Sequence, residues 1–207
     1  MITIKKNLLS ITILFVLLTA VAGCHEQPET TPTSPTPTNT PTQPTSTPTL
    51  TEGELRVHFI DVGQGDSILI DLGETEVLID GGDKSPGVVA YLNQYVDGPL
   101  EVMVATHPHA DHIGGLIAVL NAFQVEQIWH NGDTSTSQTY TEFMSAVQVE
   151  GAEVHIGRRG DEINAGEITL TILNPATLAG TTNNNSIVAS LSYGSVDFLF
   201  TGDAEQE

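Results

Sequence analysis

The feature that most constrains the fold of this chain is an apolar strand that ends directly in a cluster of histidines. Leu100 to Thr106 is a predominantly apolar run, typical of a buried strand. It leads into His107-Pro-His109-Ala-Asp111-His112, and two glycines follow at positions 114 and 115. Glycines there allow backbone segments to pack closely. We therefore expect a strand, a turn rich in metal-binding groups, and then a helix.

Three imidazoles and one carboxylate within six residues can converge on one point. His107 and His109 are two residues apart on extended chain and project the same way, so we expect both to bind one metal ion. Asp111 and His112 follow the turn and are expected to face a second ion. Imidazole nitrogen and carboxylate oxygen suit zinc, iron and manganese. The alternative is a polar surface turn that happens to be rich in histidine.

Two further aspartates stand at the ends of predicted strands. Asp203 ends the run Phe198-Leu-Phe-Thr-Gly-Asp, where a carboxylate could bridge two divalent ions and offset their mutual repulsion. Asp80 ends the run Val77-Leu-Ile-Asp. It is either a turn-forming residue or an acceptor that orients a ligand histidine.

The composition becomes globular from Thr51 onward, so residues 51–207 are expected to form one domain. Hydrophobic periodicity predicts strands at 54–60, 66–71, 76–80, 100–106, 125–129, 152–156 and 168–173, and a hairpin of 187–193 with 196–201. Helices are predicted at 85–96, with Ser85 as N-cap and Pro86 in the first turn, at 113–123 and at 139–149. Strands that first meander and later alternate with helices favour an α/β fold of sheets covered by helices.

Residues 1–23 are expected to be an export signal. Lys5 and Lys6 precede an uncharged stretch, Asn7 to Cys24, that is rich in Leu, Ile, Val and Phe. The stretch ends in Val21-Ala-Gly-Cys24, which resembles the bacterial lipobox. That resemblance implies lipidation of Cys24 and a domain anchored in a membrane, outside the cytoplasm or at the cell surface. An uncleaved membrane helix is the alternative, because this stretch nearly spans a bilayer.

The segment 24–50 is expected to be a disordered stalk behind the lipidated cysteine. His25 to Leu50 holds seven of the eleven prolines and ten threonines, and no lysine or arginine. Such a composition cannot bury enough apolar area to offset the entropy of ordering. In an extended conformation of about 3.1 Å per residue, it would hold a domain up to roughly 80 Å from the membrane.

The charge of the chain argues against wide electrostatic contact with nucleic acid. Six Lys and Arg stand against 26 Asp and Glu, which gives a net charge of −20, and two of the six bases are Lys5 and Lys6. Binding to long duplexes needs Lys and Arg that replace phosphate counterions, so it should be poor unless metal ions and a local patch dominate. The single cysteine excludes an internal disulfide and a Cys-rich zinc cluster.

The motif His107-x-His109-x-Asp111-His112 is the hallmark of the metallo-β-lactamase fold superfamily, and this chain resembles its ComEC-type branch. Four further segments carry the resemblance: FIDVGQGDS at 59–67, LIDGG at 78–82, NNNSIV at 183–188 and FLFTGDAE at 198–205. The resemblance implies an αββα sandwich with a metal centre at one edge of the paired sheets. It implies that His107 and His109 hold the first of two ions, zinc or manganese, that Asp111 and His112 hold the second, and that Asp203 bridges them.

Two departures from the superfamily pattern affect this metal centre. Many members supply a further histidine to the first metal, whereas the matching region here is Asn183 to Asn185, which we expect to form a turn rather than a ligand. Related domains also continue with a late stretch resembling Gly-His-His-Gly-Ser, which the sequence lacks. We therefore expect either a truncated piece of a longer product or a domain without one sheet edge and one ligand.

The expected activity is hydrolysis by a metal-activated water, in which Asp111 is the catalytic residue that orients the nucleophile and carries a proton. The resemblance implies a phosphodiester substrate such as DNA. Arg158, Arg159 and His130 are candidate substrate contacts. Two alternatives stay open: hydrolysis of a lactam, lactone or thioester, and a non-catalytic surface protein with a structural or degenerate metal site.

Three other aromatic residues are assigned to the scaffold. His58 and His155 alternate with apolar neighbours in predicted strands, so both are expected on exposed faces. Trp129 is expected in the core or at its rim.

Overall fold

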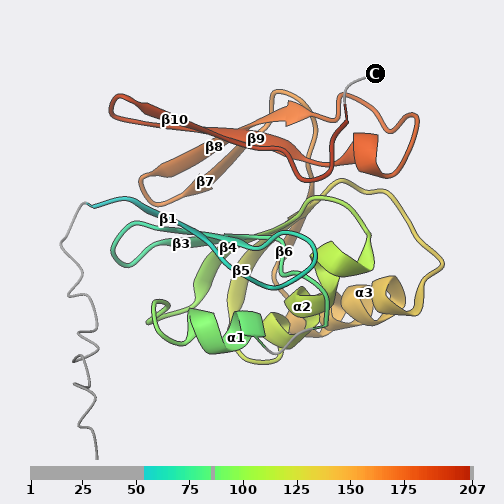
Figure 1. The fold of residues 1–207 in the computed structure, drawn as a ribbon, viewed down its shortest axis with the longest axis horizontal. Coiled ribbons are helices and arrows are strands. Elements are labelled where there is room, and N and C mark those ends of the chain that lie inside the picture. The colour runs from blue at the N-terminus through green and yellow to red at the C-terminus, as the bar shows by residue number, and fades with distance from the viewer. Residues whose placement is uncertain (1–53, 85–86, 206–207) are drawn as a thin grey trace, which may run out of the picture. The chain divides into compact units, whose positions relative to one another are not determined.

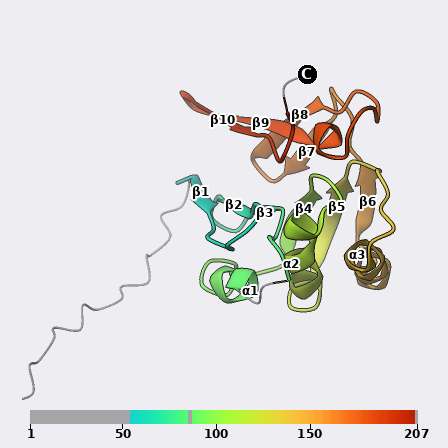
Figure 2. The same ribbon diagram turned by 45° about the vertical axis from the view of Figure 1, so that its right-hand side comes forward.

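The computed structural model describes residues 54–84 and 87–205, in which two β-sheets pack face to face (Figures 1 and 2). The larger sheet has the order β1(Arg56–Phe59), β2(Ile68–Asp71), β3(Glu76–Ile79), β4(Leu100–Ala105), β5(Val125–His130), β6(Glu153–Ile156). The smaller has the order β10(Val196–Phe200), β9(Val188–Tyr193), β8(Ile168–Asn174), β7(Glu162–Ala165). The predicted export signal, Cys24 and stalk lie outside the described residues and stay predictions.

Three helices lie on the outer face of the larger sheet: α1(Gly87–Leu92), α2(Ala110–Leu120) and α3(Gln138–Glu150) (Figure 1). A short 3₁₀ turn, η1(Asn183–Asn185), precedes β9. The predicted α/β fold is confirmed, with a helix layer and two sheet layers in the described part of the chain. None of the helices in the described ranges has the length and apolarity needed to cross a membrane.

The strand pairing of the larger sheet changes from antiparallel to parallel at β3. β1, β2 and β3 form an antiparallel meander, whereas β4, β5 and β6 add in parallel after β3. The carboxyl ends of β3, β4 and β5 therefore lie at one edge of the sheet. Loops that follow parallel strands meet at such an edge, which is where α/β proteins place their sites.

Two apolar layers hold the fold together. Val77 and Ile79 of β3 face the smaller sheet and pack with residues such as Leu170 and Ile172 of β8. Leu78, between them, faces the helices. Such alternation follows from the two-residue repeat of a strand, and each fully buried Val, Leu or Ile stabilises the fold by about 1.5–3 kcal/mol.

Helix α2 begins at Ala110, three residues earlier than predicted. His109 is its N-cap in an extended conformation, so Asp111 and His112 lie in the first helical turn rather than in a preceding loop. The close packing expected at the glycines is confirmed, because a Cβ atom on Gly115 would lie 1.9 Å from the carbonyl oxygen of Gly81. This contact fixes the start of α2 against the loop that follows β3.

Three local predictions differ from the structure. Strand β7 was not predicted, because this four-residue segment begins with a glutamate and shows little hydrophobic alternation. Its antiparallel pairing with β8 makes it a strand. Helix α1 ends at Leu92 rather than Val96, and its expected N-cap, residues 85–86, lies outside the described ranges. His58 was wrongly expected on an exposed face: its side chain is only 10% exposed and packs edge-on against Tyr91 of α1 and Tyr95, which follows α1.

Candidate metal centre

The histidine motif lies where β4 gives way to α2. Thr106 and His107 follow the last residue of β4, and Asp80 follows β3 at the neighbouring position of the sheet. Asp203 follows β10 of the other sheet. Gly202 allows this approach, because a Cβ atom there would lie 2.9 Å from the Thr106 hydroxyl and its φ of +48° suits glycine. Segments more than 120 residues apart in sequence thus meet at one edge.

Three histidines and Asp203 surround a common point. The ring of His107 has its centroid 4.2 Å from that of His112 and 4.6 Å from that of His109. Asp203 lies between two of the rings, with Oδ1 3.2 Å from His112 Nε2 and Oδ2 3.8 Å from His107 Nε2. One potential ligand atom from each of His107, His109 and Asp203 falls within 4.8 Å of the others. The two oxygens of Asp203 are therefore divided between two histidines, as a bridging carboxylate requires.

The chemistry of the donor set fits a divalent cation. His107 Nε2 is buried and has no hydrogen-bond partner among the described residues. A buried polar atom without a partner costs about 1–3 kcal/mol, so such atoms are rare unless they serve a purpose. Imidazole nitrogen with carboxylate oxygen is a ligand set of zinc and manganese sites. The residues that would hold a cation here are His107, His109 and Asp203, whereas His112 falls in a second group with Asp66 and Asp80.

Asp80 orients two of these histidines from behind. Its Oδ2 lies 2.8 Å from His112 Nδ1 and accepts a 2.6 Å hydrogen bond from the Thr106 hydroxyl, while Oδ1 accepts from the Thr106 backbone N–H. Because the Thr106 hydrogen points to Asp80, the hydroxyl oxygen can accept from His107 Nδ1, 3.1 Å away. Both rings then donate through Nδ1 and direct Nε2 toward Asp203. These hydrogen bonds are consistent with the orienting role predicted for Asp80, which stays a prediction.

Asp80 occupies an uncommon backbone conformation. Its φ is +54°, the left-handed region in which a side chain other than glycine is strained, although aspartate tolerates it better than most. The backbone N–H of Asp80 bonds to Val104 of β4, and Gly81 N–H bonds to the carbonyl of His112. The loop after β3 is thus tied on both sides to the histidine motif, which keeps the carboxylate in place despite the strain.

Burial and charge set the protonation of the two inner histidines in opposite directions. Burial, reinforced by the neighbouring His112 and His109, lowers the pKa of His107 to about 3, so its ring is neutral. Burial also disfavours the charged form of His112, but the hydrogen bond to Asp80 and the charges of the surrounding aspartates outweigh it and raise the pKa to about 9. A cation bound at His112 would therefore displace a proton.

Asp111 stands at the start of α2 and faces a different loop. Gln64 Nε2 donates a 3.0 Å hydrogen bond to Asp111 Oδ2. Burial favours the neutral carboxyl, yet this hydrogen bond and the nearby histidines outweigh it and lower the pKa of Asp111. Within the described residues Asp111 does not join the group formed by His107, His109 and Asp203. Its assignment to a second ion stays a prediction.

Four residues that the sequence interpretation gave no role also contribute to this edge. Thr106 and Ser186 approach His107 Nδ1 with their hydroxyls, the latter at 3.2 Å. Gln64 binds Asp111, and Asp66 has a carboxylate oxygen within 4.8 Å of ligand atoms of Asp80 and His112. Gln64, Asp66 and Ser186 belong to the segments that resemble the ComEC-type branch, so their signal was present without an assigned function.

The asparagine run forms the 3₁₀ turn η1. Asn184 Oδ1 accepts from the backbone N–H of Glu205, and Asn185 bonds through its side chain to Ala179 N–H and to Asp133. The side-chain amides of Asn184 and Asn185 thus form hydrogen bonds with neighbouring loops. The segment is a turn, as expected from the sequence. Asn183 Oδ1 is buried without a hydrogen-bond partner among the described residues.

The candidate substrate contacts lie in the loops after β5 and β6. His130 ends β5, and its Nδ1 accepts from the backbone N–H of Gly132. Arg158 donates through Nη1 to the carbonyls of Asn131 and Gly157, while Arg159 donates through Nε to the carbonyl of Leu173. A substrate role for all three stays a prediction.

The two scaffold aromatics of β5 and β6 stack on each other. Trp129 is 8% exposed and belongs to the apolar layer between the sheets, which confirms its expected place in the core. The His155 ring is parallel to the Trp129 ring at 4.4 Å and remains partly exposed.

Comparisons with known proteins agree with the site. The sequence matches the model of the metallo-beta-lactamase superfamily over residues 60–207. It is 26% identical over 178 residues to ComE operon protein 3 of Bacillus subtilis (strain 168), an alignment that covers 76% of this chain and 23% of that protein. The chain therefore spans less than a quarter of this relative, and the similarity supports the ComEC-type branch.

Solved structures resemble the chain in fold. The metallo-β-lactamase SMB-1 bound to 2-mercaptoethanesulfonate superposes with a TM-score of 0.50 at 16% identity, covering 70% of this chain and 60% of that one. The metallo-beta-lactamase fold protein YhfI from Bacillus subtilis gives a TM-score of 0.46 at 20% identity, covering 73% and 60%. Because the family model matches residues 60–207, which are most of this chain, the chain belongs to the metallo-β-lactamase superfamily.

Proposed function

We propose that this domain is a metal-dependent phosphodiesterase that uses two divalent cations, zinc or manganese. The observation that carries the proposal is the position of Asp203 between His112 and His107, with the buried Nε2 of His107 left without a partner. A purely structural cluster would satisfy that nitrogen with a hydrogen bond. Cations bound in such a site supply Lewis acidity, which makes hydroxide available near neutral pH and neutralises charge on phosphoryl oxygens.

The side chains of the site perform the remaining tasks. Asp80 and Thr106 hold the His107 and His112 rings in the orientation that exposes Nε2. Asp111 carries one carboxylate oxygen fixed by Gln64, which leaves Oδ1 as a proton acceptor for an attacking water. Depression of the Asp111 pKa keeps this group ionised, as a base must be.

The choice of a phosphodiester rests on the branch of the superfamily. Similarity to ComE operon protein 3 supports the ComEC-type resemblance, which implies DNA as the substrate class. The likeness to SMB-1 at 16% identity concerns the fold alone, and this fold hosts several chemistries. A lactam, lactone or thioester is therefore kept as a competitor in the test.

The decisive experiment assays the full chain, supplemented with zinc or manganese, against bis-p-nitrophenyl phosphate. His109→Ala removes an exposed ligand without opening the core, so we expect the rate to fall at least about a hundredfold, more than for residues that act only through ligands. His155→Ala, the same change at a histidine of β6, should retain activity. Equal turnover by the His109 variant and the parent would contradict the proposal.

Two measurements on the same preparation separate the competing functions. A panel containing a lactam, a lactone and a thioester beside the phosphodiester identifies the bond that is cleaved. Elemental analysis should find close to two cations per chain. One cation or none, together with no turnover on the panel, would support a structural or degenerate site instead.

A further inference from the structure

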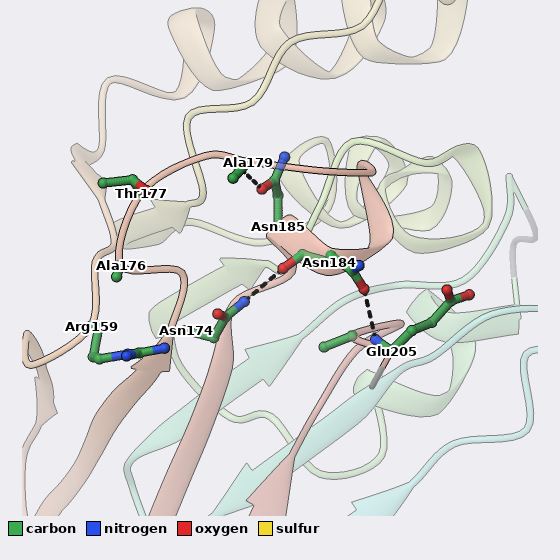
Figure 3. Close-up of a pocket in the computed structure, with 9 residues that line it drawn as sticks. Arg159, Asn174, Ala176, Thr177, Ala179, Asn184, Asn185 and Glu205 are labelled. Carbon is green, nitrogen blue, oxygen red and sulfur yellow. Dashed lines mark hydrogen bonds between the residues drawn. The ribbon is translucent and has the colours of Figure 1, made fainter. Parts of the chain in front are cut away.

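A pocket lies between the loop after β8 and the segment after β10 (Figure 3), and that segment also carries Asp203. Its volume is about 240 Å³, which is comparable to a sugar phosphate rather than to a nucleic acid duplex. Its lining consists of Arg159, Asn174, Ala176, Thr177, Ala179, Asn184, Asn185, Ala204 and Glu205. The wall is thus polar, with a single cationic side chain.

Residues on two walls of the pocket connect it along the chain to the metal centre. Ala204 and Glu205 come directly after Asp203, the proposed bridging carboxylate. On the other wall, Asn185 precedes Ser186, whose hydroxyl lies 3.2 Å from His107 Nδ1. A ligand in the pocket would therefore contact the two segments that carry Asp203 and Ser186.

The walls of the pocket are held in place by their own hydrogen bonds. Asn174 Nδ2 donates to the carbonyls of Asn184 and Ser186, and Asn184 Oδ1 accepts from Glu205 N–H. Figure 3 shows the hydrogen bonds of Asn184 with Asn174 and with Glu205. A pocket formed before binding loses little conformational entropy when a ligand enters.

Arg159 differs from the other cations of the described residues. Arg56 pairs with Glu54, Lys84 pairs with Glu142, and Arg158 donates through Nη1 to two backbone carbonyls. Arg159 uses only Nε, for the carbonyl of Leu173, so within the described ranges both terminal nitrogens are available to a ligand. In Figure 3 the carboxylate of Glu205 points away from Arg159.

We propose that this pocket binds a phosphate of a short single-stranded oligonucleotide, next to the phosphodiester that is cleaved, and that Arg159 pairs with it. The inference rests on the proposed function and narrows its substrate class. The planar guanidinium can pair with two phosphate oxygens at once. One such contact in a chain of net charge −20 suits a short substrate and disfavours duplex DNA, whose binding needs many phosphate contacts.

The test compares thymidine dinucleotides with and without a terminal 5′- or 3′-phosphate on the zinc-supplemented full chain. We expect one of the phosphorylated forms to have a kcat/KM about tenfold above that of the bare dinucleotide, because a charged hydrogen-bonded pair is added. In Arg159→Gln this ratio should fall to near one. In Arg56→Gln, which removes the same charge far from the pocket, the ratio should not change.

A binding measurement keeps this inference separable from the proposed function. Methylphosphonate-linked dinucleotides are not cleaved, so calorimetry can record their affinity with and without the terminal phosphate. We expect about tenfold tighter binding of the phosphorylated form, with a slope of log affinity against log salt near −0.7 for one phosphate contact. The inference is wrong if Arg159→Gln and Arg56→Gln behave alike. If the parent cleaves neither dinucleotide, the proposed function fails, and the calorimetry still decides the role of the pocket.

Discussion

Two clusters of buried polar side chains lie at opposite ends of strand β3. The carboxylate at one end has hydrogen-bond partners, whereas the carboxylates at the other end have none among the described residues. At the carboxyl end, Asp80 is fully buried and bonded to Thr106 and His112. At the amino end, Glu76 and Asp71 are also fully buried, but none of their carboxylate oxygens has a hydrogen-bond partner among the described residues. About 13 Å of strand separates the two ends, since a strand rises about 3.3 Å per residue.

The comparison shows that the partners of a buried carboxylate, rather than burial itself, decide what it can do. Asp80 accepts hydrogen bonds and orients metal-binding rings, so its cost of burial is offset. Burial and the nearby charges of Glu101, Asp97 and Asp71 raise the pKa of Glu76 to about 8. Asp71 and Glu76 face each other across β2 and β3, where like charges are destabilising. Burial therefore favours the neutral form of both carboxyls in the amino-end cluster.

The largest effect is expected from Asp80→Ala. The change leaves the Thr106 N–H and hydroxyl and the His112 ring without their acceptor and places alanine at a positive φ, so the free energy of unfolding should fall by about 3–5 kcal/mol. Urea unfolding at neutral pH measures the loss. Asp83→Ala, an exposed carboxylate of the same loop, should change stability by less than about 0.5 kcal/mol. Similar losses of stability in the two variants would show that the hydrogen bonds of Asp80 do not stabilise the fold more than an exposed carboxylate does.

A smaller effect of opposite sign is expected from Glu76→Gln. Because the folded-state pKa of about 8 exceeds the unfolded value of 4.5, the stabilising contribution of neutral Glu76 is complete below pH 4.5 and is lost as the pH rises through 8. Above pH 8 the glutamine variant, which never ionises, should be more stable than the parent by on the order of 2 kcal/mol.

Urea unfolding between pH 5 and pH 9 checks this pH dependence. The parent should lose stability across the range, while Glu76→Gln should follow a flatter profile. Glu162→Gln, which changes an exposed carboxylate at the start of β7, serves as the matched control and should keep the parent profile. If the free energy of unfolding of Glu76→Gln and of the parent changed equally with pH, ionisation of Glu76 would not destabilise the fold.

The smallest effect is expected from Tyr91→Phe, which tests how far the amino-end cluster is satisfied. The Tyr91 hydroxyl lies 3.0 Å from His58 Nδ1, while His58 Nε2 lies 3.6 Å from Asp71 Oδ2. Loss of the hydroxyl should reduce the free energy of unfolding by about 1 kcal/mol. Tyr140→Phe, on α3, removes a hydroxyl without a hydrogen bond to the described residues and should be nearly neutral. Equal losses in the two variants would assign no stabilising role to the His58 contact.

The sequence interpretation succeeded where a local pattern carries the information. The apolar run into His107, the two glycines of α2 and the Gly-Asp end of β10 identified the edge where His107, His112 and Asp203 meet. It failed where contacts between distant segments decide the outcome. His58 has the alternation of an exposed strand residue, but α1 and the turns after it bring Tyr91 and Tyr95 over it. Strand β7 exists because β8 pairs with it.

The sequence by itself determined the superfamily motif, the α/β fold class and the residue types that can hold a divalent cation, because these depend on periodicity and on ligand chemistry within short segments. Only the tertiary structure decided which histidine nitrogens face the position of a cation. The hydrogen bonds of Asp80 to Thr106 and His112 fix the ring orientations, and the approach of β10 brings Asp203 between His112 and His107. Such geometry depends on separate strands ending at one sheet edge, and no local segment encodes it.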